Sequence, residues 1–303
     1  MQDERADEPV FLGAGMPVLP IRRADGGVVA LPASAPTSQP GAAGAVSAPA
    51  PGSTPVTPST PDAGNAGSAD TVPDEPEDAG TPEPPLTPIH RYDFAGTGDV
   101  ATDLIGGADG RLRDGARFEG GGVVLDGADD YVELPPGLLS NLTDVTLLIW
   151  LRWDGGQCWQ RVFDIGHRRQ DPRDGSVLVA PALYLTLRSC PEDVPTLGYF
   201  ASPGQVQHVR ASEPARVGEQ AQLGFRYDAR TRQLALIADG AVTAERPLTL
   251  QLEAVGNASA WLGRSLFPDD PALDGRLEEL RIYDRALDAR ELQRVFEAGP
   301  DQL

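Results

Sequence analysis

The stretch V-T-L-L-I-W-L-R-W, residues 145–153, decides the fold. Both alternating faces of this run are apolar until Arg152, whereas a strand with one face in water alternates apolar and polar residues. We therefore predict a central strand that is buried on both sides. A second sheet should cover one face, and other side chains should cover the opposite face.

Short strand-like segments recur on both sides of this run, each bounded by turn signals. Asp239-Gly240 lies between two of them and supplies the positive φ angles of a tight hairpin turn. Many antiparallel strands joined in this way are typical of an all-β sandwich or jelly roll. The predicted strands lie near residues 90–95, 116–118, 122–126, 130–134, 144–153, 160–165, 182–189, 195–201, 206–211, 219–227, 233–238, 241–246, 258–263 and 276–284.

One short helix is predicted near the C-terminus. Asp288 followed by Glu291 forms a capping box, and Leu287 and Leu292 can form a hydrophobic staple around it. Gly299, followed by a proline, ends the helix. Apolar residues recur at helical spacing between these signals, so the helix should pack one side against the sandwich.

The first 88 residues differ in composition from the rest of the chain. They hold 17 of the 29 prolines and one of the 18 aromatic residues, Phe11. Such a segment buries too little apolar surface to offset the entropy lost on ordering. We predict a disordered Pro/Ala-rich arm over 1–88 and one β domain over 89–303. A mild apolar patch over 9–32 is either part of this arm or a short strand or docking peptide.

The net charge of the chain is −20, and residues 1–88 contribute −9 of it. Because both parts are acidic, the charge argues against nucleic acid and anionic membrane surfaces as partners, and solubility is the simplest reason for it. No run of 18 apolar residues is present, so we expect no transmembrane segment. The first residues lack the apolar region of a signal peptide. The protein therefore either stays inside the cell or has an export signal before residue 1.

Two cysteines, Cys158 and Cys190, lie outside any CxxC motif, so a zinc site is not expected. Cys158 precedes the strand predicted at 160–165, and Cys190 follows the strand predicted at 182–189. If these strands pair as a hairpin, the cysteines meet at its open end, where a disulfide would contribute about 3–4 kcal/mol. The alternative is two free buried thiols. A disulfide favours an oxidising compartment, and therefore an exported protein.

Three blocks of sequence carry a family resemblance. They are LDGADDYVELP at 125–135, WQRVFDIG at 159–166, and LGRS at 262–265 with LDGRLEELRIYDRAL at 273–287. In this order and spacing they resemble the bacterial laminin G-like (LamG) members of the concanavalin A-like lectin/glucanase superfamily. The resemblance covers about residues 91–298.

This resemblance implies a jelly-roll sandwich of two antiparallel sheets with a concave binding face and often a structural calcium. It also implies a location outside the cytoplasm. Lectins, adhesion modules and hydrolases share the fold, so the resemblance does not decide the activity. The chain departs from the family in two places. The usual Trp-His pair is missing from 218–228, and the usual Ile-Asp-Glu becomes Leu277-Glu278-Glu279.

Catalytic carboxylates are not recognisable in the sequence. On the glucanase version of this fold they come from one strand as Glu-x-Asp-x-(x)-Glu, so that alternation points them into the cleft. Glu278 and Glu279 are adjacent and therefore point to opposite faces. The three histidines, at 90, 167 and 208, have no serine or cysteine at a recognisable nucleophile elbow. We expect no enzyme, with a divergent glycoside hydrolase or polysaccharide lyase as an alternative.

A calcium site is predicted at the acidic turn D-G-A-D-D, residues 126–130, because calcium takes carboxylate and backbone oxygens. The family resemblance implies that two further carboxylates lie near this turn at one edge of the sandwich. The predicted ligands are Asp93, Asp126, Asp130 and Glu278. The alternative is an acidic surface turn surrounded by water.

Aromatic rings could bind a sugar, because a ring face matches the apolar face of a pyranose. The candidates are Trp153, Trp159, Tyr184 and Tyr199, and each could instead be core, as Trp150 and Trp261 are expected to be. The charged segment 167–174 could reach over a ligand. The sequence thus predicts a non-catalytic, extracytoplasmic carbohydrate-binding module, with a surface adhesion or structural protein that binds a protein partner as the alternative.

Overall fold

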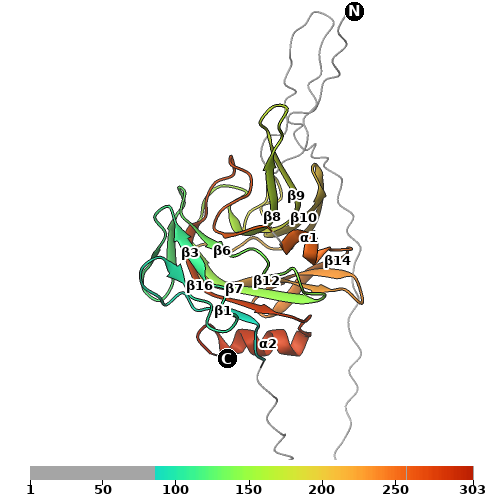
Figure 1. Cartoon of the computed structure of the whole chain (residues 1–303). Coiled ribbons are helices and arrows are strands. Elements are labelled where there is room, and N and C mark those ends of the chain that lie inside the picture. The colour runs from blue at the N-terminus through green and yellow to red at the C-terminus, as the bar shows by residue number, and fades with distance from the viewer. Residues whose placement is uncertain (1–85, 257, 303) are drawn as a thin grey trace, which may run out of the picture. The chain divides into compact units, whose positions relative to one another are not determined.

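The computed structural model describes residues 86–256 and 258–302, which form two stacked antiparallel sheets of eight strands each (Figure 1). The β7 sheet has the order β14-β13-β12-β7-β16-β5-β4, with β1 also paired to β16, and the β8 sheet has the order β11-β10-β9-β8-β15-β6-β3-β2. This architecture confirms the predicted jelly-roll sandwich. The elements are β1 (His90–Tyr92), β2 (Val100–Ala101), β3 (Gly110–Arg113), β4 (Arg117–Phe118), β5 (Val123–Asp126), β6 (Tyr131–Leu134), β7 (Val145–Trp153), β8 (Arg161–Gln170), β9 (Val177–Thr186), β10 (Thr196–Ser202), β11 (Gln205–Arg210), β12 (Gln220–Asp228), β13 (Gln233–Ala238), β14 (Ala241–Pro247), α1 (Leu252–Gly256), β15 (Ser259–Leu262), β16 (Asp274–Tyr283) and α2 (Ala289–Ala298).

Strand β7 lies between β12 and β16, and its side chains are buried on both faces except Arg152. Leu147 and Ile149 belong to the core between the two sheets. Leu148 and Trp150 belong to a second cluster on the opposite face, which α2 covers (Figure 1). The apolar run at 145–153 is therefore the doubly buried strand that its sequence predicts.

Helix α2 has the predicted capping box. The Asp288 side chain accepts a hydrogen bond from the backbone N–H of Glu291, and the Glu291 side chain accepts one from the backbone N–H of Asp288. Leu292 is buried against the β7 sheet together with Leu287. The turn between β13 and β14 has positive φ angles at Asp239 and Gly240, 47° and 75°, as predicted for this hairpin.

A buried carboxylate, Glu279, ties the C-terminal segment to the β7 sheet. It accepts hydrogen bonds from Arg91 on β1, from Arg281 on β16 and from the backbone N–H of Asp301. Burial alone would raise the pKa of Glu279, but these donors hold it below its usual value. The Arg281 guanidinium also lies 4.5 Å from the centre of the Trp150 ring. This network fixes the end of the chain next to the strand that organises the fold.

Several elements differ from the prediction. Strands β2 and β3 and the one-turn helix α1 are absent from the predicted set: β3 contains no β-branched or aromatic residue, β2 has only two residues, and a single turn is too short to show a helical period. Strand β8 extends to Gln170, and β9 begins at Val177 rather than near residue 182. This outer part of the hairpin projects beyond the sheet (Figure 1). The side chains of residues 168–170 are exposed, and Pro181 interrupts the opposite strand, so neither half shows the alternation that marks a strand.

The predicted arm over 1–88 and the apolar patch over 9–32 lie outside the described residues, apart from 86–88. In the described part of the chain, neither helix has the length and apolar character needed to cross a membrane.

The carboxylate of Asp103 organises the loop between β2 and β3. It accepts hydrogen bonds from the backbone N–H groups of residues 91, 105, 106 and 108, and one of its oxygens lies 2.7 Å from His90 Nδ1. Burial opposes ionisation, but His90 and the backbone donors hold the pKa of Asp103 at about 2. The folded pKa is below that of an unfolded aspartate, so this stabilisation is present above about pH 4 and is lost as the pH falls through 2.

We predict that Asp103→Asn lowers the free energy of unfolding at pH 7 by about 2 kcal/mol, because the neutral amide loses the charge-assisted hydrogen bonds. Urea denaturation between pH 2 and pH 7 should show the difference from wild type shrinking toward the acid end. Asp99→Asn is the control, because this carboxylate is 70% exposed in its ion pair with Arg111. A difference that is the same at every pH would contradict the assignment.

Candidate functional site on the outer face of the β8 sheet

A row of residues crosses the face of the β8 sheet that points away from the β7 sheet, which we call the outer face. Strand pairing aligns five of them side by side: His208 on β11, Gly198 on β10, Tyr184 on β9, Asp164 on β8 and Trp261 on β15. Adjacent strands are about 4.8 Å apart, so the row runs across the sheet. The alternate residues of these strands, such as Leu183 and Leu262, point inward to the core between the sheets.

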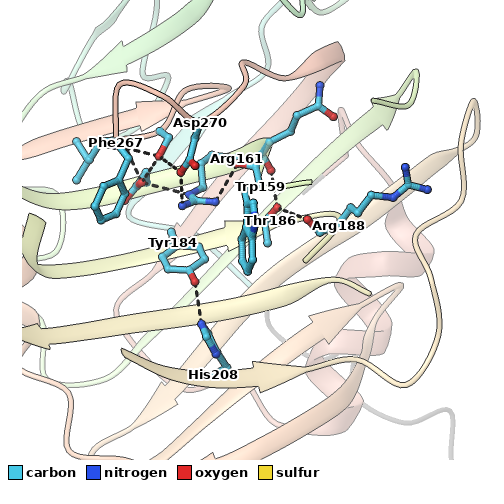
Figure 2. Close-up of polar contacts among 12 residues, drawn as sticks. Trp159, Arg161, Tyr184, Thr186, Arg188, His208, Phe267 and Asp270 are labelled. Atoms are coloured by element: carbon cyan, nitrogen blue, oxygen red, sulfur yellow. Dashed lines mark hydrogen bonds and ion pairs between the residues drawn. The ribbon is translucent and has the colours of Figure 1, made fainter. Parts of the chain in front are cut away.

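Arg161 lies at the centre of this face, with its side chain 0% exposed. Its Nε–H donates to Asp164 Oδ2 at 3.3 Å, and its Nη2–H donates to Asp270 Oδ2 at 2.8 Å. A third donor reaches the backbone oxygen of Trp159 at 2.9 Å. The guanidinium carbon lies 4.1 Å from the centre of the Tyr184 ring, and Figure 2 shows the cation held among these groups.

Asp270 belongs to the segment 263–273, which we call the β15–β16 loop. Ser265 Oγ–H donates to Asp270 at 2.8 Å, and the backbone N–H of Leu266 donates to Asp164 at 3.0 Å. Phe267 packs on Phe200, with ring centres 5.5 Å apart. These contacts fix the loop over the β9 side of the outer face.

The two carboxylates balance the buried cation. Burial raises the pKa of Asp164 to about 6, against the attraction of Arg161. Burial alone would lower the pKa of Arg161, but Asp270 and Asp164 raise it above its ordinary value. At neutral pH the guanidinium is therefore charged and Asp164 is mostly ionised. Among the described residues, Asp164 Oδ1 has no hydrogen-bond partner.

Tyr184 reaches across β10 to His208 because Gly198 lies between them. A Cβ at Gly198 would lie 2.3 Å from the Tyr184 ring. His208 Nε2 is 2.9 Å from the Tyr184 hydroxyl, and Arg210 donates to His208 Nδ1. Since Nδ1 accepts, Nε2 carries the proton and donates to the tyrosine oxygen. Burial and Arg210 lower the pKa of His208 to about 4, so this contact is between neutral groups at pH 7.

The accessible part of the outer face is a group that we call the Trp261 platform, formed by Tyr131, Trp261, Arg168 and Arg264. Both rings are partly exposed, with their centres 5.4 Å apart. The Arg264 guanidinium lies 4.7 Å from the Tyr131 ring and 5.5 Å from the Trp261 ring, and Asp114 holds it at 2.9 Å. The Arg168 guanidinium lies 5.9 Å from the Trp261 ring.

The four aromatic residues predicted to bind a ligand do not form one exposed surface. Trp153 and Tyr199 lie in the core between the sheets, and Trp153 donates its indole N–H to Gln160. Tyr184 is on the outer face but has 0% exposure. Trp159 is partly buried, with a positive φ of 73°, and lies beside Arg161.

Trp261 was expected to be core, but it is only partly buried and packs against a hydrophobic cluster on the outer face that includes Tyr184 and Leu266, not in the core between the sheets. Its neighbours Ala260 and Leu262 face the core between the sheets, so alternation along β15 turns Trp261 outward. The sequence S-A-W-L at 259–262 carries this signal. What it cannot show is that the β15–β16 loop leaves the ring partly uncovered.

The disulfide joins Cys158 to Cys190, with their Cα atoms 5.8 Å apart. Strands β8 and β9 pair as the antiparallel hairpin that the sequence predicts, so its open end brings the two cysteines together. Trp159 follows Cys158 directly, and its backbone N–H donates to the carbonyl oxygen of Arg188 at 2.8 Å. The crosslink therefore lies at the edge of the outer face.

The acidic turn after β5 gathers three carboxylates. Oxygens of Asp126, Asp129 and Asp130 lie within 4.8 Å of one another. Asp130 is 2% exposed, and its Oδ2 accepts from the backbone N–H of Asp126. Within the described residues its Oδ1 has no hydrogen-bond partner. Burial and the neighbouring Asp126 raise the pKa of Asp130.

Asp93 and Glu278 do not join this turn. Asp126 pairs with Asp274 on β16, whereas Tyr92 pairs six residues further along the same strand, with Leu280. At about 3.3 Å per residue, Asp93 and Glu278 therefore lie roughly 13–20 Å from Asp126 along β16. Glu278 instead accepts a hydrogen bond from Gln220. The predicted set of four ligands is thus not brought together.

Comparisons with known proteins show which family and which solved structures this fold resembles. Residues 126–293 match the laminin G-like model of the concanavalin A-like lectin/glucanases superfamily. The chain is similar to domain 4 of an extracellular GH43 arabinanase from Geobacillus stearothermophilus, solved with arabinotriose, at 19% identity and a TM-score of 0.55, covering 69% of this chain and 97% of that one. It is also similar to a sialidase from Trypanosoma rangeli, solved with sialic acid, at 13% identity and a TM-score of 0.52, covering 70% of this chain but only 33% of the sialidase. The comparison with curated proteins found no match.

We predict that Arg161→Met lowers the free energy of unfolding by about 3–5 kcal/mol, because it leaves two carboxylates without their counter-charge in a buried position. Arg117→Met, which removes the exposed pair with Glu119, should cost less than about 1 kcal/mol. Urea denaturation at pH 7 measures both variants. Equal, small effects would show that Arg161 does not organise the outer face.

Proposed function

Because the chain belongs to the laminin G-like family of the concanavalin A-like lectin/glucanase superfamily, we propose that it is a non-catalytic carbohydrate-binding protein whose Trp261 platform contacts the sugar. The observation that carries this proposal is a pair of partly exposed aromatic rings held in place by Arg264. A ring fixed before binding loses little entropy when a pyranose stacks on it.

The comparisons support the carbohydrate class at the level of the fold. The arabinanase domain was solved in complex with arabinotriose, and the chain spans almost the whole of that domain. An aromatic platform on one sheet of such a sandwich gives this chain a surface for the same class of ligand. A protein partner, the alternative predicted from the sequence, has no comparable observation in its favour.

The outer face offers little support for hydrolysis. Its two buried carboxylates, Asp164 and Asp270, both pair with Arg161 and are covered by the β15–β16 loop. A glycosidase needs two carboxylates that flank an accessible glycosidic bond. We therefore assign Asp164 and Asp270 to holding the loop, and we retain the divergent hydrolase or lyase as an outcome of the binding experiment.

We further propose that the protein works outside the cytoplasm and that its acidic turn binds calcium. The disulfide between Cys158 and Cys190 supports an oxidising compartment. The unpartnered Asp130 Oδ1 supports a cation, because calcium would satisfy this buried oxygen and reduce the repulsion from Asp126 and Asp129. Backbone carbonyls and water would complete the coordination.

Trp261→Ala should weaken binding to a glycan selected from an array by about tenfold or more, because the sugar loses its stacking surface. Trp159→Ala is the matched control, since that ring lies next to the disulfide, five residues before Asp164, the strand partner of Trp261. Isothermal titration measures both affinities, and thermal unfolding confirms that both variants fold. Equal losses in both variants, or turnover of the bound glycan, would refute the proposal.

Calcium at about 100 times its Kd should stabilise the domain by about 2.7 kcal/mol, which corresponds to a rise in Tm of about 5–10 °C. Asp130→Asn should abolish this shift and yet be no less stable than wild type in chelator, because it removes a buried unpaired charge. Asp269→Asn, in the exposed part of the β15–β16 loop, should keep the full shift. A wild-type Tm that chelator does not change would disprove the site.

A further inference from the structure

We propose that the sugar bound at the Trp261 platform carries a single carboxylate and that Arg168 binds it. The ligand class is therefore an oligosaccharide with an isolated uronic acid next to the unit that stacks on Trp261. This inference rests on the proposed carbohydrate-binding function and specifies its ligand.

The arginines on this face differ in whether a carboxylate of the chain already pairs with them. Arg161 is buried between two carboxylates, and Arg264 is held by Asp114. Arg168 is exposed and contacts the Trp261 ring, and no carboxylate in the described part of the chain lies within ion-pair distance of it. Its hydrogen-bond donors are thus available on the platform itself.

The backbone places Arg168 at this position. The pairing of β8 with β9 shifts register between Gly166 and Arg168, and Arg168 then pairs with Val179. An irregularity of this kind redirects the side chains that follow it. The Arg168 guanidinium lies over the Trp261 ring as a result, while the next residue, Arg169, points to the opposite face of the hairpin.

The guanidinium of Arg168 and the net charge of the chain together define the class of ligand. A planar guanidinium binds a carboxylate through two parallel hydrogen bonds, which gives it a preference for this anion. The chain has a net charge of −20, and near the platform Glu133 and Asp114 are each paired with an arginine, Arg113 and Arg264, so repulsion of an anion comes from the charge of the whole chain. A densely charged polyanion would be repelled, whereas one carboxylate beside neutral sugar units would not.

The test uses the full chain and pairs of matched ligands. Oligosaccharides that carry one uronic acid among neutral units, such as glucuronoxylo-oligosaccharides with a single glucuronate branch, are compared with the same molecules after the carboxyl group has been reduced to an alcohol. Titration calorimetry should show at least one parent binding about tenfold more tightly than its reduced form. This preference should decrease as the salt concentration is raised from 50 to 500 mM.

Variants assign the preference to one side chain. Arg168→Met should reduce affinity for the acidic parent about tenfold more than it reduces affinity for the uncharged form. Arg169→Met removes the same charge one residue away and should change neither. Arg168→Lys, which keeps the charge but not the planar donors, should give an intermediate affinity. Thermal unfolding of each variant excludes a folding defect.

The outcomes separate the inference from the proposed function. Equal binding of parent and reduced ligands would overturn the carboxylate inference and leave carbohydrate binding standing. Equal losses in the Arg168 and Arg169 variants would overturn the role of Arg168 in favour of general charge attraction. A sulfated oligosaccharide that binds more tightly than every uronate would overturn the choice of anion. Failure of every neutral and acidic glycan to bind would overturn the proposed function itself, and the inference with it.

Discussion

A fully buried guanidinium cannot remain without counter-charges, and the outer face of the β8 sheet is built to supply them to Arg161. One carboxylate, Asp164, comes from the same strand, and the other, Asp270, lies 109 residues away in sequence. Moving a charge out of water costs several kcal/mol, so the pair forms only if the β15–β16 loop folds over the sheet. The position of this loop is thus a consequence of one desolvated cation.

The position of the loop in turn determines which aromatic rings a ligand could reach. Where the β15–β16 loop covers the sheet, Phe267 packs on Phe200 and Tyr184 is completely buried. The loop leaves β15 just after Trp261, and its residue Arg264 lies against the Trp261 and Tyr131 rings. The same segment therefore closes one half of the outer face and orders the accessible half. The structural role and the proposed binding role are thus divided between neighbouring positions on one sheet.

The fold could be predicted from sequence because its determinants are local. The apolar run at 145–153, the Asp239-Gly240 turn and the Asp288 cap each act within a few residues, and the hairpin that joins Cys158 to Cys190 follows from two adjacent strands. The site could not be predicted to the same extent. Whether a ring such as Tyr199 or Trp261 faces the core depends on strand register, and whether it is covered depends on a loop held by the distant Arg161–Asp270 pair.

The same limit applies to the charged residues. Arg161 and Arg168 lie on one strand, are of one type, and both approach aromatic rings of the outer face. The sequence gives no reason to distinguish them. The structure distinguishes them, because Asp270 of the β15–β16 loop pairs with Arg161, whereas no carboxylate of the described residues pairs with Arg168. Arg161 is committed to the fold by its ion pairs, whereas Arg168, which has no carboxylate partner among the described residues, has the donors that our proposal assigns to a ligand. On the proposed function, the β15–β16 loop therefore decides which arginine of the outer face stays accessible to a ligand, and the sheet that carries both arginines is unchanged.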